Sequence, residues 1–250
     1  MKVIILAGGL GTRLSEETQI KPKPMVEIGG YPILWHIMNH YSKFGYIDFV
    51  ILLGYKGYII KEYFVNYFLH NSDFTVDLGN NNVEIINKQN LNWKVTLVDT
   101  GINSMTGARV KKVEHLVGNN TFMLTYGDGL IDLNINELVK FHRKHEAAVT
   151  MTSAQPDGRF GALDIKGNKV VKFQEKPKGD GSWINAGYFV CDKDLFKYIE
   201  DGDDVVLEQK PLKLLAKDNQ LFTYKHEGFW MPMDTLRDKI KLEKIWKEKN

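Results

Sequence analysis

The sequence has little cysteine, no long apolar run and almost no net charge. One cysteine, Cys191, in 250 residues excludes an internal disulfide framework and a zinc site built on cysteines. No apolar run approaches the roughly 18–20 residues that a membrane span needs. The 33 basic residues exceed the 31 acidic ones by only two. We therefore expect neither a membrane nor a nucleic acid as the main partner.

The first apolar run covers only residues 2–7 and ends in Gly8-Gly9. This run is too short for a signal peptide and lacks the small-residue cleavage site that such a peptide carries. A buried first strand is the better interpretation, and the simplest expected compartment is the cytoplasm.

The first half of the chain alternates between strand-like and helix-like segments. Short apolar runs predict strands at residues 2–7, 49–53, 94–98 and 122–126. Helical spacing predicts helices over 33–41, 57–69, 109–117 and 135–145. This alternation is typical of a parallel sheet that is covered by helices on both faces.

The second half has strand-like segments at 148–153, 162–165, 169–174 and 184–190, with few helices between them, and a closing helix at 235–248. We predict an α/β fold with a Rossmann-like, mostly parallel mixed sheet and a small β-rich extension. The chain forms one continuous domain, residues 1–250, with functional halves of about 1–130 and 131–250.

The segment GGLGTRL, residues 8–14, follows the first predicted strand. Glycines there allow backbone N–H groups to approach an anion closely. Leu14 stands where a dinucleotide fingerprint needs its third glycine, and Gly11-Thr12-Arg13 is not the Gly-Lys-Ser/Thr of a P-loop. A phosphate loop that uses Arg13 in place of lysine remains, beside the alternative of a tight turn with an exposed arginine.

A second cation follows in the segment KPKPM, residues 21–25. The two prolines hold the backbone extended, so Lys23 is a candidate to neutralise phosphate charge. A solvated loop lysine is the alternative for this residue, and the pairing with Arg13 favours the functional role.

Two aspartates lie far apart in the sequence. Asp128 lies between glycines at the end of the predicted strand 122–126. It is suited to bind Mg²⁺, and the alternative is an ordinary turn residue. Asp234 or Thr235 could cap the last helix, and Thr235 with Asp238 resembles a capping box. Spacing alone favours the cap for Asp234.

Three further polar residues are candidates for a sugar phosphate. Glu175 and Lys176 end a predicted strand and are fixed by Pro177, although a surface charge pair is the alternative. Asn185 lies within an apolar strand and needs partners if it is buried, and a ligand hydroxyl could supply one.

The segments GGLGTRL at 8–14 and KPKPM at 21–25 together resemble the signature of sugar-1-phosphate nucleotidyltransferases. The segments GYKGY at 54–58 and PMDTLRDK at 232–239 favour the cytidylyl branch of that superfamily. The resemblance runs nearly end to end. It implies an Mg²⁺-dependent enzyme that takes CTP and glucose 1-phosphate to CDP-glucose and pyrophosphate, for deoxysugar synthesis in a surface polysaccharide such as O-antigen.

The resemblance also implies residue roles, with nucleotide binding in the first half and sugar-phosphate binding in the second. The catalytic residues would be Arg13, Lys23 and Asp128, the Mg²⁺ ligands Asp128 and Asp234, and the sugar-phosphate contacts Glu175, Lys176 and Asn185. The nucleotide would contact Leu6, Ala7, Gly8, Gly9, Leu10, Gly11, Thr12, Arg13, Lys23, Ser104, Arg109 and Asp128. Relatives are commonly oligomeric, so a homo-oligomer is expected, in which the aromatic residues 63, 64, 67 and 68 form an interface or belong to the core.

Two alternatives stay open. A related enzyme could use UTP, dTTP or GTP, or another phosphorylated acceptor, because spacing does not settle the choice of base. A non-catalytic regulatory subunit with the same fold would be expected to lack Arg13 or Asp128, and both are present.

Overall fold

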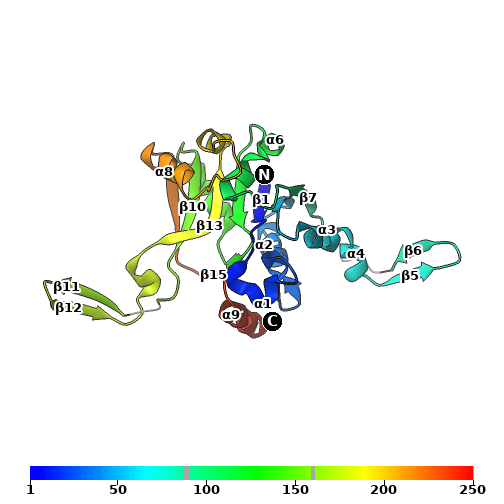
Figure 1. The fold of residues 1–250 in the computed structure, drawn as a ribbon, viewed down its shortest axis with the longest axis horizontal. Helices are drawn as coiled ribbons and strands as arrows, with labels where there is room; N and C mark the ends of the chain where they lie inside the picture. Colours follow the sequence, from blue (N-terminus) through cyan, green and yellow to red (C-terminus); the bar gives the residue numbers. More distant parts are fainter. Residues whose placement is uncertain (87–90, 159–160, 250) are drawn as a thin grey trace.

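A seven-stranded sheet forms the centre of the molecule (Figure 1). The computed structural model describes residues 1–86, 91–158 and 161–249. The sheet order is β14-β10-β13-β8-β1-β4-β7. Its first-half strands are β1 (Lys2–Ala7), β4 (Asp48–Leu53), β7 (Lys94–Asp99) and β8 (Phe122–Tyr126). These four strands pair in parallel, so their carboxyl ends lie along one edge.

Strands from the second half extend the same sheet. They are β10 (Val149–Ala154), β13 (Ile184–Cys191) and β14 (Leu221–His226). β13 runs antiparallel to both β8 and β10, whereas β10 and β14 are parallel. The predicted mostly parallel mixed α/β sheet is therefore confirmed. The β-rich extension is smaller than expected, because the segments at 148–153 and 184–190 belong to the central sheet.

Alternate residues of β1 enter two different hydrophobic clusters. Val3 and Ile5 face the cluster that includes residues of α2 (Ile33–Ser42) and α7 (Ile135–His142). Ile4 and Leu6 face the cluster that includes residues of α5 (Thr106–Lys111), α6 (Glu114–Val117) and α8 (Lys210–Lys217). A strand buried on both faces requires this near-continuous apolar sequence, and helices cover both faces as predicted.

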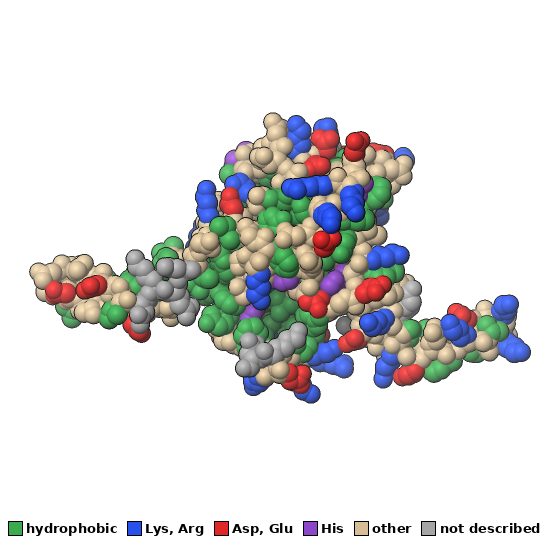
Figure 2. All heavy atoms as spheres, turned by 180° about the vertical axis from the view of Figure 1, so that it is seen from behind, with side chains coloured by type: hydrophobic (Ala, Val, Ile, Leu, Met, Phe, Trp, Pro, Cys, Tyr) green, Lys and Arg blue, Asp and Glu red, His purple; other side chains and the backbone are tan. Residues whose placement is uncertain are grey.

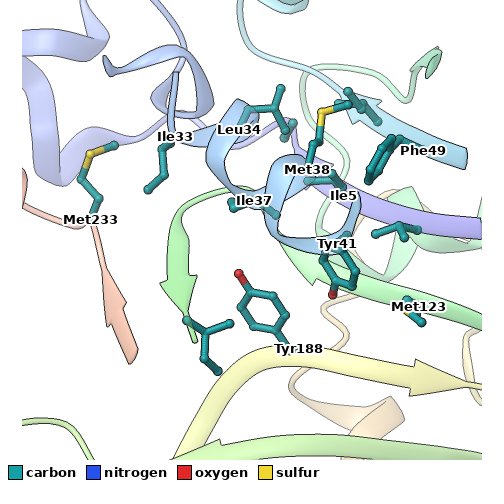
Figure 3. Close-up of a cluster of buried hydrophobic side chains, with 14 of the residues drawn as sticks. Ile5, Ile33, Leu34, Ile37, Met38, Tyr41, Phe49, Met123, Tyr188 and Met233 are labelled. Atoms are coloured by element: carbon teal, nitrogen blue, oxygen red, sulfur yellow. The ribbon is translucent and has the colours of Figure 1, made fainter. Parts of the chain in front are cut away.

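The first of these clusters is drawn in Figure 3. Leu34, Ile37 and Tyr41 of α2 point from their helix towards the sheet, where Ile5 and Tyr188 lie. The rings of Tyr41 and Tyr188 stack with centroids 5.8 Å apart. α2 therefore covers the face of the sheet to which Val3 and Ile5 of β1 contribute their side chains.

Two predicted helices are each divided in two. Residues 57–69 form α3 (Gly57–Val65) and α4 (Tyr67–His70), with a break at Asn66. Residues 109–117 lie in α5 and α6, with a break before Glu114 at Val113. Asparagine and β-branched valine are weak helix formers, so a helix can end at these positions although the apolar spacing continues.

The last helix, α9 (Leu236–Lys249), agrees with the prediction, whereas α8 and β14 were not predicted. Short elements connect the rest. They are η1 (Thr12–Leu14), α1 (Ser15–Thr18), η2 (Lys23–Met25), β2 (Glu27–Ile28), β3 (Tyr31–Pro32), β9 (Gly129–Ile131), η3 (Lys178–Gly181), η4 (Lys193–Tyr198) and β15 (Trp230–Pro232).

Two hairpins project from opposite sides of the body as arms (Figure 1). One arm is β5 (Phe74–Asp77) with β6 (Asn82–Ile85), and the other is β11 (Ala162–Lys166) with β12 (Lys169–Gln174). Figure 2 shows hydrophobic side chains on the surface of both arms. Across the described ranges, no helix has the length and apolar character needed to cross a membrane.

Candidate active site

A cavity of about 760 Å³ opens at the carboxyl ends of the parallel strands. This is the edge at which open α/β sheets bind ligands. Most of the predicted site residues line it, namely Leu6, Ala7, Gly8, Gly9, Leu10, Gly11, Thr12, Arg13, Lys23, Ser104, Arg109, Asp128, Asn185 and Asp234. Segments from the whole length of the chain therefore meet in one place.

The glycine loop requires glycine at two positions. Gly11 has φ 65° and precedes η1, a conformation that favours glycine. A Cβ on Gly8 would lie 2.4 Å from the guanidinium of Arg109, so no larger residue fits there without moving that side chain. No atom lies within 4 Å of the position of a Cβ on Gly9. The loop can therefore receive a ligand against its backbone at Gly9.

Four charged side chains meet beside this loop. Lys23 Nζ lies 2.6 Å from a carboxylate oxygen of Asp128 and 2.7 Å from one of Asp234. Arg13 Nη1 lies 2.8 Å from the other carboxylate oxygen of Asp234. The Lys23 side chain is 10% exposed, whereas that of Arg13 is 71% exposed. Lys23 is thus held between two carboxylates, and Arg13 stays accessible to a ligand.

The same geometry separates the roles of Asp234 and Thr235. Thr235 Oγ1 accepts a hydrogen bond from the backbone N–H of Asp238, and Asp238 accepts one from the N–H of Thr235 at 2.9 Å. This reciprocal pair is the capping box of α9. Spacing favoured a cap for Asp234, but Thr235 is the cap, and the Asp234 carboxylate turns to the cations instead.

Arg109 is buried, and its guanidinium binds backbone carbonyls at the ends of three strands. It lies 2.9 Å from the carbonyl of Leu53, 2.7 Å from that of Gly101 and 3.1 Å from that of Gly8. Burial lowers the pKa of this guanidinium. Arg109 lines the cavity, and in this structure its hydrogen bonds hold the cavity wall.

Ser104 lies in a second polar group on the same wall. Its hydroxyl is 2.5 Å from the carbonyl of Thr100 and 2.7 Å from the carboxylate of Asp203. Lys112 Nζ donates to Ser104 Oγ at 2.8 Å and to Asp203 at 2.6 Å. The hydrogen bonds from Lys112 and Ser104 lower the pKa of Asp203. These hydrogen bonds therefore connect Ser104, just before α5, to Asp203.

The three predicted sugar-phosphate residues are not brought together. Asn185 lines the cavity and accepts a hydrogen bond from the backbone N–H of Gly187 at 2.8 Å. Glu175 and Lys176 lie outside it, with side chains 64% and 61% exposed, and their charged groups are 3.5 Å apart. As placed here, they form the surface charge pair that was the alternative.

Sequence reasoning missed several polar and aromatic residues of the cavity. Thr106, Tyr126 and Trp230 line it, and Trp230 Nε1 donates to the carbonyl of Ala186 at 2.8 Å. Tyr126 immediately precedes Gly127-Asp128, so its position at the end of a buried strand was an available signal. Nothing in the local pattern around Trp230 distinguishes it from a core aromatic.

The carboxylates of Asp128 and Asp234 fit a magnesium ion. They flank one ammonium group at 2.6 and 2.7 Å, so a cation already occupies the space between them. Within the described ranges, no three His, Cys, Asp or Glu side chains gather in a way that could hold a metal. Two carboxylates suffice for Mg²⁺ when phosphates and waters complete its shell.

Three comparisons place the chain among known proteins. The family described as nucleotidyl transferase matches residues 2–241. Glucose-1-phosphate cytidylyltransferases of Salmonella typhimurium and Salmonella typhi are each 56% identical over 249 residues, covering 99% of this chain and 96% of theirs. The crystal structure of HddC from Yersinia pseudotuberculosis has a TM-score of 0.70 at 24% identity and covers 98% of this chain and 99% of its own.

Proposed function

Because this chain belongs to the nucleotidyl transferase family, we propose that it transfers a cytidylyl group from CTP to glucose 1-phosphate, giving CDP-glucose and pyrophosphate. The supporting observation is the meeting of Arg13, Lys23, Asp128 and Asp234 beside a glycine loop in one cavity. The 56% identity to glucose-1-phosphate cytidylyltransferases supports this nucleotide and this sugar.

In the proposed reaction, a phosphate oxygen of glucose 1-phosphate attacks the α-phosphorus of CTP in line, a new P–O bond forms, and the bond to pyrophosphate breaks. The attacking phosphate is already ionised, so the chain need not supply a general base. Its task is to hold two mutually repelling anions together and to neutralise the charge that develops. Arg13 and Lys23 are the cations placed for this in the cavity.

The nucleotide belongs against the glycine loop in this proposal. The open position at Gly9 lets triphosphate oxygens reach the backbone, and the exposed Arg13 supplies a planar fork of donors. Residues of about 1–130 thus bind the nucleotide, and residues of about 131–250 bind the sugar phosphate. Asn185 is the sugar-side residue already in the cavity.

Asp128 and Asp234 would hold Mg²⁺. When bound, Mg²⁺ would supply charge neutralisation at the phosphates and at the leaving pyrophosphate. The ammonium of Lys23, which lies between the two carboxylates, would be released to contact phosphate oxygens.

We also propose that the protein is a homo-oligomer in which the two arms make contacts between copies. Leu78, on the β5–β6 arm, is 84% exposed, and Phe173, on the β11–β12 arm, is 61% exposed. The first arm carries Asp77 and Glu84. The second carries Lys166, Lys169 and Lys172 beside the single carboxylate of Asp164, so the two arms have net charges of opposite sign. Light scattering on the purified protein tests this, and a monomer would contradict it. The cytoplasmic location stays a prediction.

Pyrophosphate release with Mg²⁺ and glucose 1-phosphate, measured separately with CTP, UTP, dTTP and GTP, tests the function. Release with CTP alone is expected. Release with another nucleotide would keep the chemistry and overturn the choice of base. No release with any of the four would overturn the proposed function and favour a ligand-binding, regulatory role.

A further inference from the structure

A chain of hydrogen bonds joins the two walls of the cavity through a residue outside the predicted site. Thr106 Oγ1 donates to Glu208 Oε2 at 2.6 Å, and the hydroxyl of Tyr126 donates to Glu208 Oε1. Asn185 Nδ2 in turn donates to the hydroxyl of Tyr126 at 3.3 Å. Glu208 is 82 residues from Tyr126 in the sequence, and only the folded chain brings them together.

The chemistry of a carboxylate sets the direction of every bond in this chain. An ionised carboxylate only accepts hydrogen bonds, so both hydroxyls must point their protons at Glu208. The lone pairs of the Tyr126 oxygen are then free to accept from Asn185. Burial and the nearby charge of Glu208 raise the pKa of Tyr126, which keeps its phenol protonated as a donor.

Asn185 is consequently held at both ends of its amide. Its Oδ1 accepts from the backbone N–H of Gly187, and one N–H of Nδ2 is directed to Tyr126. The ring of Tyr126 packs closely against Gly187, where a Cβ would lie only 2.3 Å from a ring carbon, so this contact requires glycine. One N–H of the Asn185 amide remains for a ligand in the cavity that this residue lines.

The segment that carries Glu208 is docked firmly on the start of α5. The carbonyls of Asp203 and Val205 accept from the N–H groups of Met105 at 2.8 Å and Ala108 at 3.1 Å. The N–H of Leu207 donates to Thr106 Oγ1 at 2.9 Å, and Leu207 is 1% exposed. These bonds do not need the Glu208 side chain, so its removal should leave the segment and Thr106 in place.

We propose that Glu208 is a positioning residue for the sugar-phosphate substrate. Glu208 orients the hydroxyl of Tyr126, which orients the Asn185 amide so that its remaining N–H meets an oxygen of glucose 1-phosphate. The inference rests on the proposed function for the identity of that substrate. Its effect falls on the sugar side, because Thr106 keeps its bond from Leu207.

Steady-state kinetics of Glu208→Ala and Tyr126→Phe test the inference. Each should raise the KM for glucose 1-phosphate about five- to tenfold, the value of one lost orienting hydrogen bond, and leave the KM for CTP within about twofold. Glu208→Gln should restore a KM near that of the wild type, because its Oε1 can accept from Tyr126 while its amide donates to Thr106. A merely structural role would not give this split or this rescue.

The double variant Glu208→Ala/Tyr126→Phe decides whether the two residues act in series. Its KM for glucose 1-phosphate should match that of Tyr126→Phe alone within about twofold. Multiplying effects, or equal rises in both KM values, would overturn the inference. Asp204→Asn, an exposed carboxylate in the same segment, is the matched control and should behave as the wild type.

Calorimetric binding of glucose 1-phosphate to the same variants separates this inference from the proposed function. Weaker binding by Glu208→Ala, with rescue by Glu208→Gln, supports the positioning role even in an enzyme that releases no pyrophosphate. An active wild type whose Glu208→Ala variant keeps its KM and its binding would overturn the inference alone. A wild type that does not bind glucose 1-phosphate would overturn it as well.

Discussion

At the scale of single residues, the distinctive feature is an ammonium group held between two carboxylates. Lys23 contacts both Asp128 and Asp234 from a side chain that is 10% exposed, and the prolines on either side of it fix its backbone. Two positive charges, on Lys23 and Arg13, balance the two negative charges of Asp128 and Asp234 before any substrate binds. A triphosphate and a divalent cation could therefore enter together without leaving the site with a large net charge.

Arg13→Ala and Asp128→Ala should each lower kcat by about two to three orders of magnitude while the protein stays folded. Each removes a charge that faces the cavity and little packing, since both side chains are partly exposed. The measurement is pyrophosphate release beside a thermal melt. Arg143→Ala, an exposed arginine at the end of α7, is the control. Near-normal turnover in either variant would contradict the assignment.

Lys23→Met should increase the thermal stabilisation of the substrate-free protein by Mg²⁺. Without the ammonium, the carboxylates of Asp128 and Asp234 repel each other, and a bound cation relieves that repulsion in the folded state only. We expect Mg²⁺ to raise the melting temperature of this variant more than that of the wild type. The variant Lys21→Met, which removes a nearby lysine paired with Glu27, is the control. Equal shifts in all three proteins would contradict competition between the Lys23 ammonium and a cation for these carboxylates.

At the scale of elements, the end of β12 differs most from expectation. Glu175 and Lys176 follow the strand as the sequence indicates, but the arm carries them outside the cavity. Lys176 adopts φ 46°, a left-handed conformation that is uncommon for a residue with a side chain. Such conformations occur both at sharp turns and at functional sites, so the backbone of Lys176 fits either a turn or a role in binding.

Lys176→Met tests whether this segment reaches the sugar phosphate. If the lysine meets the phosphate during turnover, the KM for glucose 1-phosphate should rise about tenfold or more through the loss of a charge-assisted hydrogen bond. Lys172→Met, on β12 of the same arm, is the matched control. A KM equal to that of the control would leave Lys176 as half of a surface ion pair with Glu175.

At the scale of the whole molecule, four buried or half-buried histidines link stability to pH. Burial lowers the pKa of His36, His40, His142 and His145 below the ordinary value of 6.5. These imidazoles lie on or just after α2 and α7 rather than in the cavity, and His40 bonds the carbonyl of Leu133 at 2.8 Å. They therefore influence folding rather than the proposed chemistry.

The free energy of unfolding should fall as the pH drops below about 6.5. The unfolded chain takes up protons at its ordinary histidine pKa, whereas the folded chain resists them until the pH reaches the lowered values. Each histidine contributes at most about 1.4 kcal/mol per pH unit in that window. Urea unfolding at pH 7.5, 6.5 and 5.5 measures the slope. His40→Gln should reduce it, whereas exposed His70→Gln should not. A flat profile would contradict the prediction.

The sequence by itself determined the parallel strands, the glycine loop and the family. Apolar runs such as 2–7 and 122–126 must be buried on both faces, so composition alone is enough to place them in a covered sheet. The glycines at 8, 9 and 11 and the segment at 21–25 are local patterns, and local patterns are visible along the chain. The candidates Arg13, Lys23 and Asp128 follow from them.

Only the tertiary structure decided which of these residues meet. That the Asp234 carboxylate contacts Lys23, which lies 211 residues away along the chain, is visible only in the folded structure. The breaks at Asn66 and Val113 are likewise not visible in the periodic pattern, which continues through both positions. Glu208 carries no local signal, because a hydrogen bond to Tyr126 exists only after β8 and the segment before α8 have come together. Contacts between distant segments depend on burial and hydrogen bonding over the whole chain. A short stretch of sequence therefore does not predict them.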